Sequence, residues 1–138
     1  MARKKMPPFA ALKEACAPLQ PQTEAEIKIA CLDWLTRLHY RPIRIQTGNL
    51  VVPAGQHRRR CIQCAPIGTA DCLIVLPPNG YALFVEFKSE KGKQSPEQIE
   101  FAEWCASVGA GYRLIRSLDD LIAAMREEVE NGKVRRPT

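Results

Sequence analysis

Two charged residues stand close together near the middle of the chain, in a run that is otherwise apolar. The segment YALFVEFK is typical of a strand, and it contains Glu86 and Lys88 near its end. Because successive side chains of a strand point to opposite faces, these two residues share one face. An isolated carboxylate in the interior of a sheet is costly, so Glu86 needs a cation, which is either Lys88 or a metal ion.

A second carboxylate is expected beside this pair. Asp71 starts the apolar run DCLIVL, and the turn signal PPNG separates this run from YALFVEFK. Two strands that pair antiparallel through this turn bring Asp71 close to Glu86 and Lys88. The alternative for Asp71 is to cap the turn that follows Gly68, and the alternative for the other two is an ion pair on an exposed face.

Two carboxylates and a lysine on neighbouring strands have a specific chemical use. Carboxylate oxygens hold hard divalent cations such as Mg²⁺ or Mn²⁺, which keep waters and substrate phosphate oxygens as their other ligands. Such a cation lowers the pKa of a bound water and stabilises charge that builds on phosphorus, while the lysine orients the water or helps to deprotonate it. These residues therefore predict the hydrolysis of a phosphodiester.

The elements that position these residues follow from periodicity and turn signals. Thr23 with Glu26 forms a capping box at the start of an amphipathic helix, and Ser95 with Gln98 forms another. In chain order, the expected elements are a helix from Thr23, a hairpin of two strands (43–46 and 58–64), a second pair of strands (71–76 and 81–88), a helix from Ser95, a strand (112–116) and a last helix from Ser117. This order predicts an α/β domain with a mixed sheet.

The length of 138 residues fits one domain, and 20 Lys and Arg against 15 Asp and Glu give a net charge of +5. This excess favours a polyanionic partner. We expect a basic, proline-rich N-terminal arm (1–22), a folded domain (23–130) and a basic C-terminal tail (131–138). No apolar run in the sequence is long enough for a membrane span, and the first residues lack a secretory signal, so we expect a cytoplasmic protein.

Six cysteines are scattered through the helical and strand patterns, which favours reduced and mostly buried thiols over a disulfide framework. Cys61 and Cys64 have the spacing of half a zinc site, but the sequence has no second pair with matching spacing. We interpret them as reduced thiols on the expected hairpin.

The order of these motifs resembles that of a nuclease superfamily. The segment GTAD ending at Asp71, followed by EFK over 86–88, looks like the D-(x)n-E-x-K core of the PD-(D/E)xK nucleases. The following KGKQSPEQ and FAEWCASVGAGY closely resemble the VRR-NUC family, the virus-type replication-repair nucleases. The match runs from Thr23 to Asp120, most of the chain. It implies a restriction-endonuclease-like fold, in which helices flank a mixed β-sheet.

The resemblance also implies a set of site residues and a cofactor, Mg²⁺ or Mn²⁺. The implied metal ligands are Asp71, Glu86 and the backbone carbonyl of Phe87; the implied catalytic lysine is Lys88; and the motif glutamine near the active site is Gln98. The helix cap alone would also explain Gln98.

Members of the family carry an acid at the start of their first helix, and two residues compete for this place. We prefer Glu24 over Glu26, because the capping box already gives Glu26 a structural role.

Four basic residues are candidates for contacts with DNA phosphates. Lys91 and Lys93 flank Gly92 in the loop after Lys88, where a merely solvated loop is the alternative. Arg58 and Arg60 fall on one face of an expected strand.

The function predicted by these motifs is that of a metal-dependent DNA endonuclease. Resemblance to the stand-alone, virus-encoded members implies a homodimer of phage origin that acts on branched DNA such as four-way (Holliday) junctions. The rival interpretations are a non-catalytic nucleic-acid-binding module and a general or restriction-type nuclease.

Overall fold

The computed structural model describes residues 22–131. The expected N-terminal arm and C-terminal tail lie outside the described residues, apart from Gln22 and Asn131. The elements are α2 (Glu24–Arg37), β1 (Ile43–Arg44), β2 (Asn49–Pro53), β3 (Arg59–Gln63), β4 (Cys72–Leu76), β5 (Tyr81–Phe87), α3 (Pro96–Val108), β6 (Gly111–Ile115) and α4 (Leu118–Glu130). Within the described range, none of the helices combines the length and the apolar character that crossing a membrane requires.

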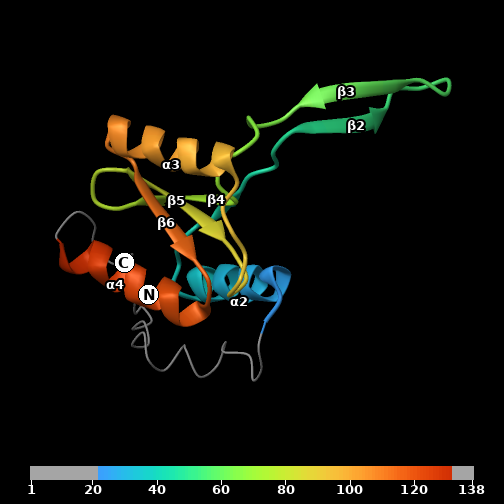
Figure 1. Cartoon of the computed structure of the whole chain (residues 1–138). Coiled ribbons are helices and arrows are strands. Elements are labelled where there is room, and N and C mark those ends of the chain that lie inside the picture. Colours follow the sequence, from blue (N-terminus) through green and yellow to red (C-terminus); the bar gives the residue numbers. More distant parts are fainter. Residues whose placement is uncertain (1–21, 132–138) are drawn as a thin grey trace, which may run out of the picture.

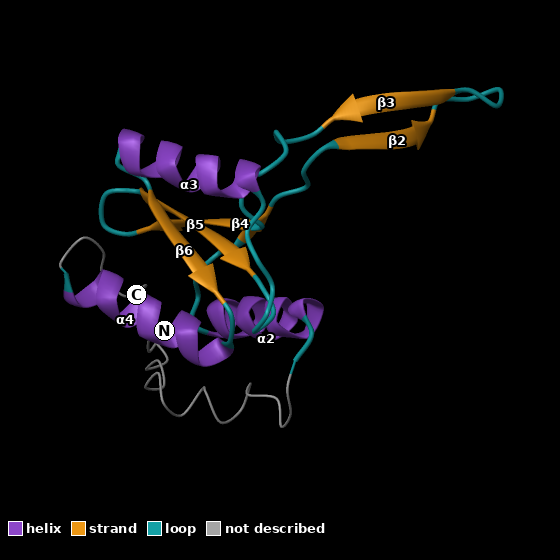
Figure 2. Ribbon diagram, in the orientation of Figure 1, coloured by secondary structure: helices purple, strands orange, loops and turns teal. Residues whose placement is uncertain are grey.

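A mixed sheet of four strands forms the centre of the domain, in the order β1-β4-β5-β6. Figure 2 shows β4, β5 and β6 between the helices. The strand β5 pairs antiparallel with β4 and parallel with β6, which confirms the predicted mixed α/β architecture. The register places Cys72 opposite Val85. Asp71 precedes Cys72 and Glu86 follows Val85, so these two residues are neighbours across the antiparallel pair, as the PPNG turn predicts.

Helices cover both faces of this sheet, with α3 on one face and α2 and α4 on the other (Figure 1). The main core lies on the side of α2 and α4, and includes Trp34, Leu35, Ile74, Leu83, Val85, Phe87, Ile115, Leu121 and Met125. On the α3 side the packing is aromatic, since the ring centroids of Phe84 and Phe101 lie 5.0 Å apart. The alternation along β5 thus sends Phe87 into the main core and Glu86 to the opposite face of the sheet.

The helices begin where their capping residues predict. The side chain of Thr23 accepts a hydrogen bond from the backbone N–H of Glu26, and that of Ser95 accepts one from Gln98. In both cases the reciprocal bond completes the capping box. The helix α3 ends at Gly109, whose φ of 79° is the left-handed conformation that glycine adopts most easily.

The strands β2 and β3 form a separate sheet of two antiparallel strands. This hairpin extends away from the rest of the domain (Figure 1). Within residues 22–131, no other helix or strand packs against it. The hairpin is therefore an appendage, and the four-stranded sheet alone organises the core.

The predicted pairing of segments 43–46 and 58–64 is wrong. The first of these segments pairs with β4 instead, where the backbone N–H of Ile45 donates to the carbonyl oxygen of Asp71 at 2.8 Å. Gly48, with a φ of 78°, then turns the chain out of the main sheet. The partner of β3 is the segment NLVVP that follows, whose uninterrupted apolar run lacks the alternation by which an exposed strand is recognised.

Candidate active site

The carboxylate of Asp71 is held by contacts from two elements. One oxygen, Oδ2, accepts a 2.9 Å hydrogen bond from the backbone N–H of Phe87 in β5. The other, Oδ1, lies 3.2 Å from Nζ of Lys28 in α2. Asp71 is only partly exposed, and it lies just before the first residue of β4. It therefore joins the sheet to α2 and does not act as a simple turn cap.

Glu86 is buried to 2% exposure on the sheet face toward α3. Its Oε1 lies 3.2 Å from Nζ of Lys88 and accepts a 2.8 Å hydrogen bond from Nε2 of Gln98. Its Oε2 is buried and has no hydrogen-bond partner within the described residues. Burial, and then repulsion by the carboxylate of Asp71, raises the pKa of Glu86, and the lysine only partly opposes this.

The unpartnered oxygen, Oε2 of Glu86, is the feature that suits this site to a divalent cation. A buried carboxylate oxygen without a partner is costly, and a cation shared with Asp71 would satisfy it. Within residues 22–131, no group of three or more His, Cys, Asp or Glu side chains could hold a metal. Two carboxylates with backbone and water oxygens suit Mg²⁺ or Mn²⁺, which keep several waters, better than they suit zinc. The residues present fit the cation that the sequence motifs imply.

Gln98 has two roles at once. Its Oε1 accepts a 2.9 Å hydrogen bond from the backbone N–H of Ser95, which closes the capping box of α3. Its Nε2 donates to Glu86, which lies twelve positions earlier in the chain. The two roles use different atoms of one amide, so the helix cap also fixes the direction in which this amide donates.

The two acids that compete at the start of α2 are separated by their contacts. Glu26 is exposed, and its carboxylate accepts a 2.8 Å hydrogen bond from the backbone N–H of Thr23, as the capping box predicts. Glu24 is half-buried, and its negative charge is close enough to contribute to the raised pKa of Glu86. These contacts favour Glu24 as the acid that faces the site.

Lys28 belongs to the cluster, although sequence reasoning did not select it. Its contact with Asp71 spans 43 positions of the chain. The available signal was helical spacing, because Lys28 follows Glu24 by four positions and therefore lies on the same face of α2. The cluster thus has two ammonium groups, one on each carboxylate.

The loop after Lys88 is held by a guanidinium. Nη1 of Arg116 donates to the carbonyl oxygens of Ser89 and Gly92 at 2.8 and 2.6 Å. Lys91 and Lys93, the two candidates for phosphate contacts, are exposed on this loop beside the site. Arg58 and Arg60, the other two candidates, lie instead on the projecting hairpin and are not part of the carboxylate cluster.

Three comparisons place these observations among known proteins. No family model matches the sequence, and no curated protein does. Among solved structures, a "VRR_NUC domain protein" is similar to this chain with a TM-score of 0.52 and 19% sequence identity, over 80% of this chain and 91% of that chain. This likeness confirms the expected fold, a restriction-endonuclease-like mixed sheet flanked by helices.

Proposed function

We propose that this protein is a metal-dependent DNA endonuclease that hydrolyses phosphodiester bonds. The observation that carries the proposal is the neighbouring pair of carboxylates, in which a buried oxygen of Glu86 has no partner within the described residues. A structural ion pair would be expected to satisfy both oxygens, whereas a cation site leaves ligand oxygens available. The similar solved structure carries the name of a nuclease domain, which agrees with this assignment.

In this proposal Asp71 and Glu86, with the backbone carbonyl of Phe87, hold Mg²⁺ or Mn²⁺. When bound, the ion lowers the pKa of a water ligand and offsets the negative charge that builds on the phosphorus. Lys88, whose Nζ lies 3.2 Å from Oε1 of Glu86, would orient the attacking water or help to take its proton.

The remaining site residues act on the carboxylates. Gln98 donates to Oε1 of Glu86 and thereby directs the other oxygen toward the cation. Glu24 adds negative charge at the edge of the site, which favours a divalent cation there. The half-buried position of Glu24 at the start of α2 would let it hold a water of the ion's hydration shell.

The substrate in this proposal is DNA, and branched DNA such as a four-way (Holliday) junction is its preferred form. Lys91, Lys93, Arg58 and Arg60 would contact backbone phosphates, which carry no sequence information. A homodimer would present two active sites related by a two-fold axis, so that opposed strands of a junction are nicked. The proposal further assigns the protein to the cytoplasm of the host of a phage.

The decisive test is the variant Lys88→Ala, with Lys91→Ala as its matched control. Both remove one positive charge from the same stretch, but only the first removes the ammonium next to Glu86. We expect Lys88→Ala to abolish Mg²⁺-dependent cleavage of DNA while it still binds a four-way junction, and Lys91→Ala, which loses one phosphate contact, to bind more weakly but still to cleave. Undiminished cleavage by Lys88→Ala would remove the mechanism, and a wild-type protein that binds junctions without cleaving them in Mg²⁺ or Mn²⁺ would be a binding module.

The substrate and the assembly need separate measurements. Cleavage of a four-way junction is compared with cleavage of linear duplex and of flaps with the same arm sequences. Equal rates would indicate a general nuclease. Sedimentation of the purified full chain at several concentrations tests the homodimer, since a single species of 15.5 kDa would exclude it.

A further inference from the structure

The projecting hairpin is the largest part of the described chain that the proposed chemistry leaves unused. We name β2, β3 and the turn between them, residues 49–63, the ribbon. At its root, short backbone hydrogen bonds hold the two segments that flank the ribbon together: the N–H of Gly48 donates to the carbonyl of Ala65 at 3.0 Å, and the N–H of Cys64 donates to that of Gly48 at 2.8 Å. Beyond this root, no other element of the described chain touches the ribbon.

The ribbon is a two-stranded sheet without a core of its own. Both strands are almost wholly exposed, and the exposed apolar residues include Leu50, Val51 and Ile62, at 44%, 57% and 43% exposure. An isolated hairpin of two strands is marginally stable in water. A segment that exposes this much apolar surface so far from the body is best explained by a partner that covers it.

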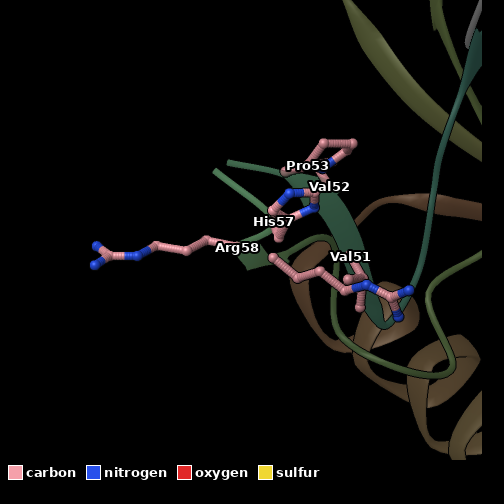
Figure 3. A pocket seen from close by; sticks show the side chains of 6 residues that line it. Val51, Val52, Pro53, His57 and Arg58 are labelled. Atoms are coloured by element: carbon pink, nitrogen blue, oxygen red, sulfur yellow. The ribbon is translucent and has the colours of Figure 1, made fainter. Parts of the chain in front are cut away.

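The charge of the ribbon indicates the chemical class of that partner. The sequence has no Asp or Glu between Asp33 and Asp71, whereas the ribbon carries three consecutive arginines, 58–60. Among the described residues, none of these arginines has a carboxylate within ion-pair distance. Figure 3 shows the side chain of Arg58 extended away from the ribbon. Uncompensated cationic charge of this kind attracts a polyanion.

The helix α3 carries exposed negative charge, opposite to the positive charge of the ribbon, and this supports a polyanion as the partner of the ribbon. Three glutamates at successive turns of the helix, Glu97, Glu100 and Glu103, are exposed to solvent. A phosphate backbone is repelled by this surface and attracted by the ribbon. The polyanion is therefore expected to run along the ribbon and to avoid these glutamates of α3.

The two faces of the ribbon differ in charge. Arg60 is opposite Val52 in the ladder, and Arg59 is opposite Pro53, so neighbouring arginines point to different faces. Arg58 has the parity of Arg60, and the turn continues the ladder through a 2.9 Å bond from the N–H of Ala54 to its carbonyl. One face thus carries two arginines, and the other carries one.

The dimensions and chemistry of this face suit a groove of DNA. The major groove admits a two-stranded β-ribbon, and each five-residue strand spans about 17 Å. Arginines at that depth donate to phosphates or to guanine edges, and apolar side chains contact thymine methyl groups. The combination of exposed arginines and exposed aliphatic residues, which is costly in water, is therefore favourable in this groove.

The root of the ribbon joins it to the candidate active site. The N–H of Ile45, four residues before β2, donates to the carbonyl of Asp71 itself. The ribbon therefore leaves the main sheet close to Asp71, and duplex DNA held at Asp71 and Glu86 would have the base of the ribbon beside it.

We propose that the ribbon lies in the major groove of duplex DNA next to the cleaved phosphodiester, with the face of Arg58 and Arg60 toward the DNA. This inference rests on the DNA-cleaving function proposed above, and it adds a second, separate contact to that function. The ribbon would then set which duplex arm of a branched substrate is held while the carboxylates act on the strand beside it.

The test compares Arg60→Ala with Arg59→Ala in the full chain, without Mg²⁺ or Mn²⁺ so that the DNA stays intact. Both variants remove one charge at neighbouring positions, but from opposite faces. We expect Arg60→Ala to lower the slope of log K for junction binding against log salt by about 1, and the double variant Arg58→Ala/Arg60→Ala by about 2. Arg59→Ala should leave the slope near the wild-type value.

Dimethyl sulfate footprinting identifies the groove, because it methylates guanine N7 in the major groove and adenine N3 in the minor groove. The wild type and Arg59→Ala should protect guanine N7 beside the cleavage position, and Arg58→Ala/Arg60→Ala should lose this protection. Equal effects of the Arg59 and Arg60 variants, protection confined to adenine N3, or a change in self-association with unchanged DNA binding would each overturn the proposal.

A small substrate distinguishes failure of the proposal for the ribbon from failure of the proposed nuclease function. The small diester bis(p-nitrophenyl) phosphate cannot reach from the carboxylates to the ribbon, so its hydrolysis should be the same in the wild type and in all ribbon variants. A wild type that protects guanine N7 through Arg58 and Arg60 but hydrolyses neither this diester nor DNA overturns the proposed function and leaves the role of the ribbon standing.

Discussion

The side-chain amide of Gln98 donates a 2.8 Å hydrogen bond to the buried carboxylate of Glu86. The same amide caps α3 through its oxygen, which accepts from the backbone of Ser95. The first turn of the helix is therefore locked to the strand that carries the candidate metal ligand. A substitution that keeps the cap and removes the donor separates the two roles.

Gln98→Glu is that substitution. A glutamate at this position still accepts from Ser95 in a capping box, but when ionised it cannot donate to Glu86 and its charge repels that carboxylate. A hydrogen bond to a charged group contributes about 1.5–3 kcal/mol. We expect kcat/KM for DNA cleavage to fall about tenfold to hundredfold, with the helix content from circular dichroism unchanged. Gln98→Ala, which removes both roles and adds no charge, should have a lower thermal stability than the wild type; a stability equal to that of the wild type would contradict the capping role.

Lys28 would compete with a metal ion for Asp71, so its removal should strengthen metal binding. Its Nζ is 3.2 Å from Asp71 Oδ1, and both side chains are about three-quarters buried, with 25% and 23% exposure. An ion pair of this kind contributes about 0.5–1 kcal/mol. We expect Lys28→Met to bind Mn²⁺ about two- to fivefold more tightly by titration calorimetry. Lys28→Arg, which keeps the charge, serves as the control, and weaker binding by Lys28→Met would show that the lysine supports the site instead.

Glu86 should destabilise the metal-free protein at neutral pH. Burial and the nearby Asp71 raise the pKa of Glu86 above its usual value of 4.5. The unfolded chain therefore loses this proton at a lower pH than the folded protein does, and the free energy of unfolding falls as the pH rises from 4.5 through the folded pKa. Glu86→Gln has no carboxyl group to ionise at this position, so its free energy of unfolding does not fall in this way. In EDTA at pH 7 this variant should therefore be more stable than the wild type.

Urea unfolding in EDTA between pH 4 and pH 7 measures this difference, which should shrink toward the acid end because both proteins are then neutral at this position. Addition of Mn²⁺ should restore stability to the wild type and leave Glu86→Gln unchanged, since binding to the folded state alone stabilises it. A wild type that is the more stable protein in EDTA at pH 7 would show that Lys88 and Gln98 fully compensate the buried charge.

Short-range signals in the sequence were sufficient for the frame of the site. The capping residues Thr23 and Ser95 each act within three positions, and their helices begin where they indicate. The turn between β4 and β5 is equally local, so the pairing that brings Asp71 to Glu86 was predictable from alternation and one turn signal. These features depend on neighbours in the chain and little on the rest of the fold.

The features that escaped prediction depend on contacts between distant segments. Lys28 meets Asp71 only because α2 packs against the sheet, and its helical spacing from Glu24 alone does not state this. The apolar residue Ile99 of α3 is 47% exposed, because the helix turns Phe101 and Cys105 toward the sheet instead. The ribbon was misread for a related reason: its strands are not held by a core, so their sequence lacks the alternation that burial of one face imposes.

Gly68 sets the distance between the strand that follows Asp71 and the helix that carries Gln98. A Cβ at Gly68 would lie 2.5 Å from the carbonyl oxygen of Glu97, a backbone atom of the first turn of α3, and the φ of 94° already disfavours a side chain. Gly109 at the other end of α3 has a φ of 79° and open space around a Cβ, so it is a matched control.

We expect Gly109→Ala to cost about 1–2 kcal/mol in the free energy of unfolding, because only the left-handed backbone is disfavoured. Gly68→Ala should cost about 1–3 kcal/mol more, since the clash must push α3 away from the sheet. The same displacement lengthens the contact between Gln98 and Glu86, so cleavage should fall in Gly68→Ala and stay near the wild-type rate in Gly109→Ala when both are assayed well below their melting temperatures. Equal losses of stability in urea would mean that α3 shifts freely and that its first turn does not set the geometry of the site.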